Sequence, residues 1–146
     1  MPRPWLPLTL ALGGCDPLYT AELTFVVPAD LLGPFDDAHR GQVLSTADQL
    51  LHTEAILCEP SDEELRLEHD LGGIGCGRRT RYTVWVEPLR FPYDTQGNPI
   101  GCGEDQVQLE GPAAPPADAP RAQGVLFAVD ERCPEHDELV LVLGGP

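Results

Sequence analysis

The feature that most constrains this chain is its high content of residues that interrupt helices. Sixteen prolines and fifteen glycines occur among its 146 residues. Proline cannot donate the backbone N–H bond that an interior helical position needs, and glycine loses more backbone entropy there than any other residue. A helical bundle or a coiled coil is therefore excluded, and the four prolines of residues 111–122 predict a stiff exposed loop. The length is sufficient for one domain with a hydrophobic core and too short for two.

The charge balance excludes one class of partner. Twenty-four acidic residues face nine basic residues, all of them arginines, which gives a formal net charge of −15. Proteins that bind nucleic acid gain most of their affinity from cationic contacts with phosphates, so we expect no nucleic-acid partner. The chain is also 42% hydrophobic and only 23% charged. That composition is typical of a folded domain rather than of a disordered segment.

Several segments alternate between apolar and polar residues, which is the pattern of a half-buried strand. The clearest are residues 19–27, which end before a proline, and residues 79–87. Further strands are expected at 65–70, 106–110, 123–130 and 138–143. The last of these is apolar at every position from Leu139 to Leu143. An uninterrupted apolar run predicts that both faces of that strand are covered.

Residues 41–58 fit two structures. The first is a β-hairpin that turns at residues 47–49. The second is a helix near residues 46–57, with Ser45 as its N-cap and one apolar stripe. Because the rest of the chain is strand-like, and consistency among segments favours one fold class, we predict the hairpin. An α+β fold that contains the helix is the alternative.

These segments together predict an all-β fold, a single antiparallel β-sandwich that occupies residues 19–146. The order of Cys76, Trp85 and Cys133 is similar to that in immunoglobulin domains, so we expect an immunoglobulin-like architecture. The chain does not fit the true immunoglobulin family. Cys76 lies only nine residues before Trp85, and Glu131 stands where a tyrosine corner needs tyrosine.

Residues 1–14 have the order of parts found in a secretory signal peptide. Arg3 and the free amine form a short positive region, and residues 5–12 form an apolar region. Two small residues and then Cys15 follow. The apolar run is far shorter than the roughly 20 residues that a membrane-spanning helix needs.

The string Leu12-Gly13-Gly14-Cys15 resembles a lipobox, the cleavage motif of bacterial lipoproteins. The resemblance implies cleavage before Cys15, which removes the signal peptide. It also implies a diacylglyceryl group on the Cys15 sulfur, with residues 15–18 as a short tether to the domain. Acyl chains stabilise membrane attachment by about 0.8 kcal/mol per buried CH₂. The expected location is therefore the bacterial cell envelope, anchored in a membrane and facing the periplasm or the exterior.

Four cysteines remain after Cys15, and export leads to an oxidising compartment, so we predict two disulfides. Three pairings are possible. If the strands on either side of the proline-rich loop form a hairpin, Cys102 lies almost opposite Cys133, which favours the pair Cys102–Cys133. The same reasoning favours Cys58–Cys76 around the excursion between them. Each bridge would stabilise the fold by about 2–4 kcal/mol.

Metal sites are the alternative use of such residues. Cys133 and His136 have a Cys-x-x-His spacing that zinc sites use, but the sequence holds no second half-site. Asp36, Asp37 and Asp94 could supply loop oxygens to calcium, although no stretch matches a calcium-loop motif. We therefore expect neither a metal nor a cofactor.

Groups able to carry catalysis are few. The two serines, Ser45 and Ser61, lie outside any Gly-x-Ser-x-Gly motif. The sequence shows no catalytic partner for any of the four histidines, which are His39, His52, His69 and His136. The consecutive residues Glu68-His69-Asp70 are of catalytic types. In a strand, however, neighbouring side chains point to opposite faces, so His69 would not face Glu68 or Asp70. We expect a solvated strand end there, no catalytic residue and no thiol nucleophile.

The sequence therefore predicts a lipid-anchored, disulfide-stabilised protein of the bacterial envelope. Its expected role is that of a non-catalytic binding or assembly module, with the membrane and an unidentified envelope protein as partners. The alternative is a small envelope enzyme or domain that depends on calcium or zinc. A third possibility is a subunit of a larger surface complex that donates its apolar C-terminal strand to a neighbour.

Overall fold

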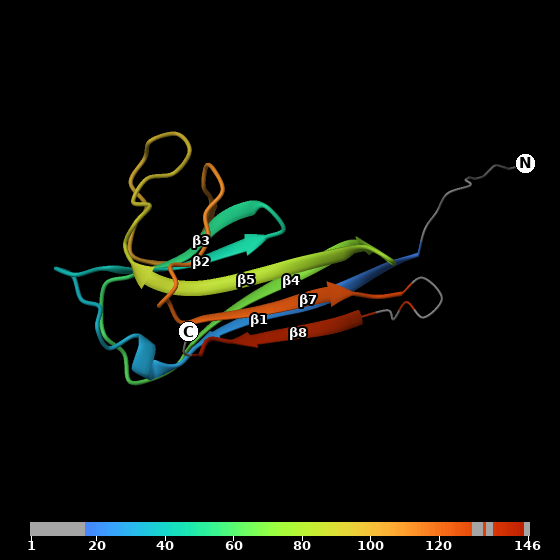
Figure 1. Cartoon of the computed structure of the whole chain (residues 1–146), viewed down its shortest axis with the longest axis horizontal. Helices are drawn as coiled ribbons and strands as arrows, with labels where there is room; N and C mark the ends of the chain where they lie inside the picture. Colours follow the sequence, from blue (N-terminus) through green and yellow to red (C-terminus); the bar gives the residue numbers. More distant parts are fainter. Residues whose placement is uncertain (1–16, 130–132, 134–135, 145–146) are drawn as a thin grey trace, which may run out of the picture.

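The structure of the protein is a computed structural model that describes residues 17–129, 133 and 136–144, in an elongated arrangement of strands (Figure 1). The strands are β1 (Leu18–Val27), β2 (Gly41–Ala47), β3 (Leu50–Leu57), β4 (Leu65–Gly75), β5 (Arg79–Pro88), β6 (Gly103–Gln108), β7 (Arg121–Phe127) and β8 (His136–Val142). One short 3-10 helix, η1 (Ala29–Leu31), follows β1. No helix of the described residues is long and apolar enough to cross a membrane. The predicted lipobox lies outside the described residues, so its cleavage and lipidation remain predictions.

The strands form two sheets, which confirms the all-β sandwich. A three-stranded sheet has the order β4-β1-β8, and a five-stranded sheet has the order β6-β3-β2-β5-β7. One pair differs from the antiparallel arrangement we predicted, because β8 runs parallel to β1, with Val140 beside Thr24. The alternation of side chains between two faces is the same in parallel and antiparallel strands, so the sequence pattern does not reveal this direction.

The hairpin interpretation of residues 41–58 is confirmed. β2 and β3 pair antiparallel, with Ala47 opposite Leu50, so the turn consists of Asp48 and Gln49. Asp48 has a positive φ of 57°, a conformation that aspartate tolerates better than most residues. Its carboxylate also accepts a hydrogen bond from the backbone N–H of Arg81, at 3.1 Å. β2 also pairs with β5, and β3 also pairs with β6. These pairings explain why residues 41–58 form strands rather than a helix.

The main core lies between the two sheets. Its buried apolar side chains include Phe25, Val27, Val43, Val84, Leu67 and Leu141. β7 and β8 approach each other closely, and a Cβ added at Gly124 would lie only 2.6 Å from Cδ2 of Leu141. Glycine at this position therefore lets the edges of the two sheets come together. Reciprocal backbone hydrogen bonds between Arg121 and Gly144, both 3.1 Å, close the same edge.

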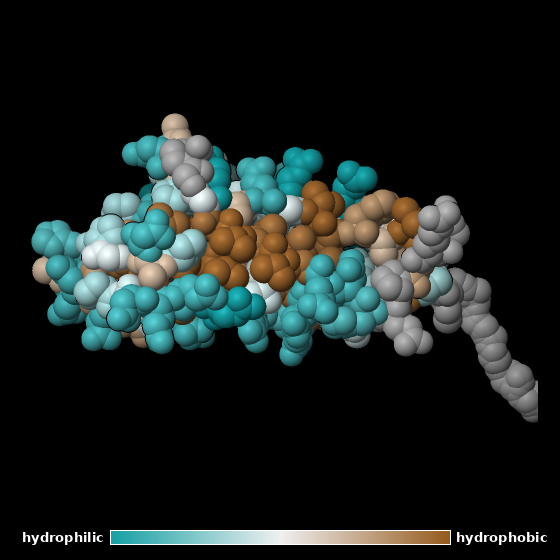
Figure 2. Space-filling model, turned by 90° about the horizontal axis from the view of Figure 1, so that it is seen from below, coloured by the Kyte–Doolittle hydropathy of each residue, from teal (hydrophilic) through white to brown (hydrophobic). Residues whose placement is uncertain are grey.

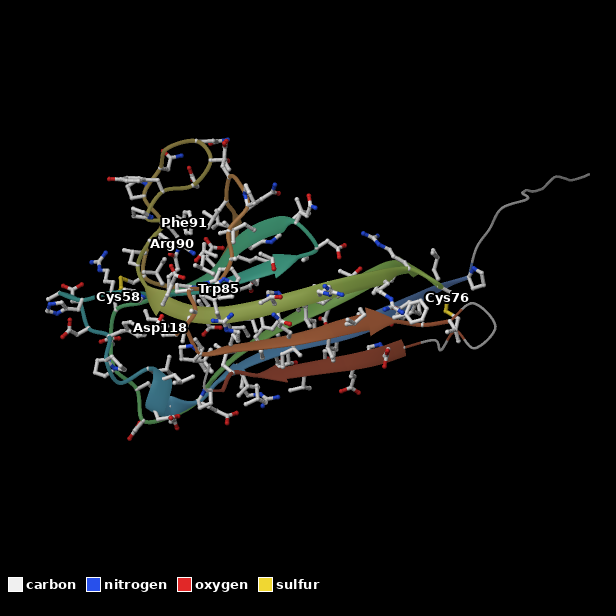
Figure 3. All side chains as sticks on the ribbon, viewed as in Figure 1. Cys58, Cys76, Trp85, Arg90, Phe91 and Asp118 are labelled. Atoms are coloured by element: carbon white, nitrogen blue, oxygen red, sulfur yellow. A yellow bond between two sulfur atoms is a disulfide. The ribbon has the colours of Figure 1, made fainter. Side chains whose placement is uncertain are left out.

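A second apolar cluster covers the outer face of the five-stranded sheet. Trp85 is fully buried there beneath the long loops that follow β5 and β6, and Ala119 packs in the same cluster. Figure 3 shows Trp85, Arg90 and Phe91 gathered where these loops cross the sheet. Trp85 Nε1 donates to Glu87 Oε2 at 2.7 Å, and Arg90 Nε lies 2.6 Å from Glu87 Oε1. Most of residues 111–118 are exposed, as expected of a stiff exposed loop, and Ala119 is the buried residue that holds the proline-rich segment against the sheet.

The prediction that both faces of the last strand are covered is wrong. β8 is an edge strand of the three-stranded sheet, and only its inner side chains, such as Leu141, are buried. Val140 and Val142 point outward and remain 50% and 56% exposed. No described element packs over the outer face of this sheet at these two valines.

Candidate functional site

Two disulfides form, but with pairings that differ from our prediction. Cys58 bonds to Cys102, with Cα atoms 6.0 Å apart, and Cys76 bonds to Cys133, with Cα atoms 5.8 Å apart. The predicted pairs Cys58–Cys76 and Cys102–Cys133 are wrong. Cys58 follows β3 and Cys76 follows β4, and these two strands belong to different sheets. The hairpin assumed for Cys102–Cys133 does not exist. β6 pairs with β3 and β7 pairs with β5, so β6 and β7 lie at opposite edges of the five-stranded sheet.

The observed disulfides follow from strand neighbours. Ile56 of β3 is opposite Gly103 of β6, so the cysteines just beyond these residues meet at that end of the sheet. Leu18 at the start of β1 pairs with Gly75 at the end of β4, next to the Cys76–Cys133 bridge. Figure 3 places Cys58 and Cys76 at opposite ends of the sandwich. Each end is therefore held by one covalent link.

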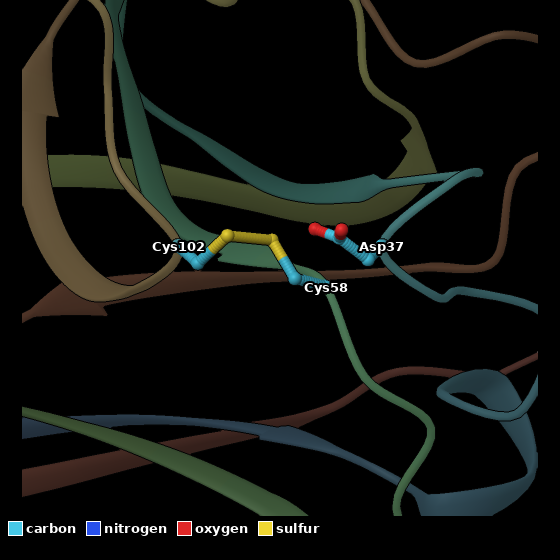
Figure 4. A group of neighbouring side chains, drawn as sticks. All are labelled: Asp37, Cys58 and Cys102. Carbon is cyan, nitrogen blue, oxygen red and sulfur yellow. A yellow bond between two sulfur atoms is a disulfide. The ribbon is translucent and has the colours of Figure 1, made fainter.

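The carboxylate of Asp37 lies near the disulfide between Cys58 and Cys102. The distances among these three side chains are those of a metal site, but their chemistry is not. Figure 4 shows the carboxylate of Asp37 directed toward Cys58 and Cys102, and one oxygen and the two sulfurs lie within 4.8 Å of one another. Both sulfurs are in a disulfide, whereas the sulfur that binds a metal is a thiolate. Asp37 also accepts a hydrogen bond from Arg40 at 2.9 Å. This group does not form a metal-binding site.

The other residues considered as metal ligands are engaged elsewhere. Cys133 is in a disulfide, and Nδ1 of His136 lies 2.8 Å from the hydroxyl of Thr20, so the Cys-x-x-His pair does not converge on one point. Asp36 accepts a hydrogen bond from the backbone three residues later, and Asp94 accepts two such bonds within its own turn. These aspartates stabilise separate loops in the described part of the molecule.

The polar group that sequence reasoning missed is Glu54. The register of β3 shifts between Thr53 and Ala55, both against β2 and against β6, so Glu54 is the extra residue of a β-bulge. A bulge re-aims one side chain of a strand. Here it directs Glu54 into the space between the sheets, where its side chain is only 1% exposed. The one acidic residue of β3, within the sequence Leu-Leu-His-Thr-Glu-Ala-Ile-Leu, was the available signal.

Three polar side chains surround the Glu54 carboxylate. The hydroxyl of Ser45 and the amide Nε2 of Gln106 donate to Oε2, at 2.7 and 2.8 Å. Nε2 of His69 lies 2.6 Å from Oε1, so this bond joins β4 of one sheet to β3 of the other. The strand end expected to be solvated at His69 is instead part of an interior network, and the ring is only 21% exposed.

The network lacks the geometry of a catalytic triad. In such a triad the hydroxyl donates to the imidazole, which acts as the general base. Here the Ser45 hydroxyl donates to the carboxylate of Glu54, and that carboxylate separates it from His69. Ser45 is also buried, so a substrate would not reach its oxygen. The arrangement is suited to holding the two sheets together rather than to acyl transfer.

Both ionisable groups of this network favour their charged forms. The hydrogen bond to Glu54 raises the pKa of His69 above its ordinary 6.5, although burial acts in the opposite direction. Burial raises the pKa of Glu54, but the hydrogen bonds from His69, Ser45 and Gln106 together outweigh it and hold the pKa below 4.5. The link between the sheets is therefore an ion pair while Glu54 is ionised and His69 is protonated.

We expect the stability contributed by this ion pair to depend on pH on both sides. The contribution of Glu54 is present above its unfolded-state pKa of 4.5 and is lost as pH falls through its lowered pKa in the folded state. The contribution of His69 is present below 6.5 and is lost as pH rises through its raised pKa. Urea unfolding of the wild type and of His69→Gln should therefore differ most between pH 4.5 and 6.5. A difference that stays constant with pH would contradict the assignment.

A row of three hollows follows β4 along its length. The first, of about 370 Å³, separates the N-terminal end of β4 from the end of β3. The second, of about 240 Å³, lies between the middle of β4 and β6. The third, of about 680 Å³, separates the C-terminal part of β4 from the β2–β3 turn. We call this row the β4 groove; its walls are β4 on one side and residues 47–50, 54–59 and 102–106 on the other.

The β4 groove is strongly acidic. Exposed carboxylates that line it are Asp48, Glu59, Glu63, Glu64, Glu68, Asp70, Glu104 and Asp105. Among the described residues that line the groove, Arg78 in the third hollow is the one arginine. Apolar side chains such as Leu50, Leu71 and Ile74 line the same hollow and are exposed or partly exposed. The groove thus combines apolar walls with a surplus of negative charge, which is typical of a surface that binds a cationic ligand.

A second unusual surface is an apolar band along the opposite flank (Figure 2). Its exposed side chains are Val125 and Phe127 of β7, Val129 just beyond it, and Val140 and Val142 of β8. The guanidinium of Arg79 lies 4.8 Å from the centre of the Phe127 ring and covers part of it. Exposed apolar patches of this kind can mark contact surfaces between proteins. Apart from Arg79 over Phe127, the side chains of this band lie open, with 38% to 56% of each exposed.

Comparison with known proteins gives no relative. No protein-family model, no curated protein and no solved structure matches the chain.

Proposed function

We propose that this protein is a lipid-anchored, disulfide-stabilised component of the bacterial cell envelope that acts as a non-catalytic binding or assembly module. The β4 groove is the observation that carries the binding role. It is an open, elongated surface of apolar and acidic residues beside a strand edge that pairs with no other described strand. The buried ionisable residues around Glu54 are arranged to join the sheets, and buried Glu87 is paired with Arg90.

The position of β1 supports the anchor. Only two residues, Asp16 and Pro17, separate Cys15 from Leu18, where β1 begins. Acyl chains on Cys15 would therefore hold the end of the sandwich that carries the Cys76–Cys133 disulfide close to the bilayer. Two disulfides in a domain of this size also support export to an oxidising compartment.

The anchor is tested by metabolic labelling with a radioactive fatty acid in a bacterial host. We expect the wild-type chain to carry the label and to fractionate with membranes, because the Cys15 sulfur is the acceptor. Cys15→Ala should lose the label completely and should remain as an unprocessed precursor.

The matched control is the double variant Cys58→Ala/Cys102→Ala, which removes two sulfurs from the folded domain and leaves the lipobox unchanged. It should keep the label. Equal, unlabelled product from the wild type and Cys15→Ala would overturn the anchor. Stoichiometric zinc or calcium in elemental analysis of the purified protein would favour the metal-dependent alternative and contradict the proposed role.

A further inference from the structure

β4 is an unprotected edge of the three-stranded sheet. It pairs with β1 over nearly its full eleven residues, and no described strand pairs with its other side. A strand edge presents a row of backbone N–H and C=O groups that can bond to another extended chain. The three hollows of the β4 groove lie beside this strand, so there is space for such a chain between β4 and the other sheet.

The charge beside this edge selects the kind of chain that fits. Glu68 and Asp70 lie on β4 itself, and Glu104 and Asp105 face it across the groove. Arg66 compensates part of this charge, because it lies 3.2 Å from Glu64 and 3.8 Å from Glu68. Another copy of this chain would bring the same acidic strand to the edge and would be repelled. A basic segment would be attracted.

The walls of the groove select the pattern of side chains. The third hollow is lined by Leu50, Leu71 and Ile74, with Leu50 54% exposed, so it offers apolar contact to side chains that point inward. Side chains of a bound strand alternate between its two faces. A segment with apolar residues at every second position would bury them in the groove. Basic residues at the intervening positions would then reach the surrounding carboxylates.

We propose that the β4 groove binds an extended, basic segment of a partner protein, which adds as a further strand to the free edge of β4. The backbone of this segment bonds to β4, its apolar side chains enter the hollows, and its cationic side chains pair with the acidic rim. The inference rests on the proposed binding role, whose partner it specifies, and is independent of the lipid anchor.

The experiment uses the full chain with both disulfides formed and a fluorescein-labelled probe peptide. The probe is about ten residues of alternating valine and lysine with blocked termini, a length that matches β4. We expect saturable binding in fluorescence anisotropy, weakened by added salt because the attraction is electrostatic. Hydrogen exchange should slow at the β4 amides when the peptide is bound. A valine–glutamate peptide of the same length should not bind.

Two comparisons separate strand addition from unspecific charge attraction. Neutralising the groove with Glu68→Gln/Glu104→Gln/Asp105→Asn should weaken binding about tenfold, since each exposed ion pair contributes roughly 0.5 kcal/mol. The matched control Glu110→Gln/Asp118→Asn/Glu138→Gln removes the same charge from residues that do not line the groove, and it should retain most of the affinity. A valine–lysine peptide with alternate backbone nitrogens methylated cannot complete the hydrogen bonds and should bind far more weakly.

Three results would overturn the inference. These are no binding of the valine–lysine peptide at millimolar concentration, equal losses in the two triple variants, or equal affinity of the methylated and unmethylated peptides. Slowed exchange at β7 and β8 instead of β4 would assign binding to the apolar band and would also contradict it. Fatty-acid labelling is measured separately, so a failure of peptide binding leaves the lipid anchor intact, and a failure of labelling leaves the groove intact.

Discussion

Replacing both cysteines of one bridge, in Cys58→Ala/Cys102→Ala, is expected to lower the free energy of unfolding by about 4 kcal/mol. The two cysteines are separated by 44 residues, and a crosslink that closes a loop of this length strongly restricts the unfolded chain. The measurement is urea unfolding followed by tryptophan fluorescence, since Trp85 is fully buried in the folded state. The variant should keep the strand content of the wild type at low denaturant.

The disulfide pairing is checked in a separate control experiment. Proteolysis without reduction, followed by mass spectrometry, should recover Cys58 linked to Cys102 and Cys76 linked to Cys133. Recovery of a Cys58–Cys76 peptide would contradict the structure, because it would require a different set of neighbouring strands. A double variant as stable as the wild type would show that the bridge adds nothing to the fold.

Replacing Glu54 with alanine is expected to destabilise the sandwich by about 3 kcal/mol, the second of the large effects. The variant leaves the Ser45 hydroxyl and the Gln106 amide without their acceptor, and it removes the partner of His69 between the sheets. An unpaired polar group in a buried position loses its solvation without compensation. The comparison is again urea unfolding, at neutral pH.

Two further variants test whether the effect comes from the network. Glu54→Gln keeps the size and one acceptor oxygen but removes the charge, so its loss should be clearly smaller than that of Glu54→Ala. Glu104→Ala removes a carboxylate that is exposed in the same hollow and should change stability by less than about 0.5 kcal/mol. If Glu54→Ala and Glu104→Ala had equal effects, Glu54 would not link the sheets.

Most strands could be predicted because their pattern is local. Residues 19–27 and 79–87 alternate in a way that only a strand with one buried face explains, and both correspond to strands in the structure. The hairpin of β2 and β3 was a closer decision, because the same apolar residues also fit one face of a helix. Neighbouring strands on both sides of the hairpin settled it. Consistency with the rest of the chain was therefore the informative criterion.

The candidate site could not be predicted in the same way. Glu54 faces His69 only because a bulge shifts the register of β3, and a bulge leaves no regular trace in the apolar pattern. The β4 groove is formed by segments far apart in the chain, with Glu68 on one wall and Glu104 on the other. The acidic character of the chain was evident from composition, but its concentration beside a free strand edge was not.

The sequence by itself determined that the chain is an all-β domain, where most of its strands lie, and that its four later cysteines would pair. These properties depend on side chains within one segment or on simple counts. The tertiary structure decided which strands are neighbours, and with them the two disulfide pairings, the parallel contact of β1 with β8 and the free edge of β4. The physical reason is that strands pair through backbone groups that are the same in every residue. The choice of partner therefore arises only when all the strands pack around one core.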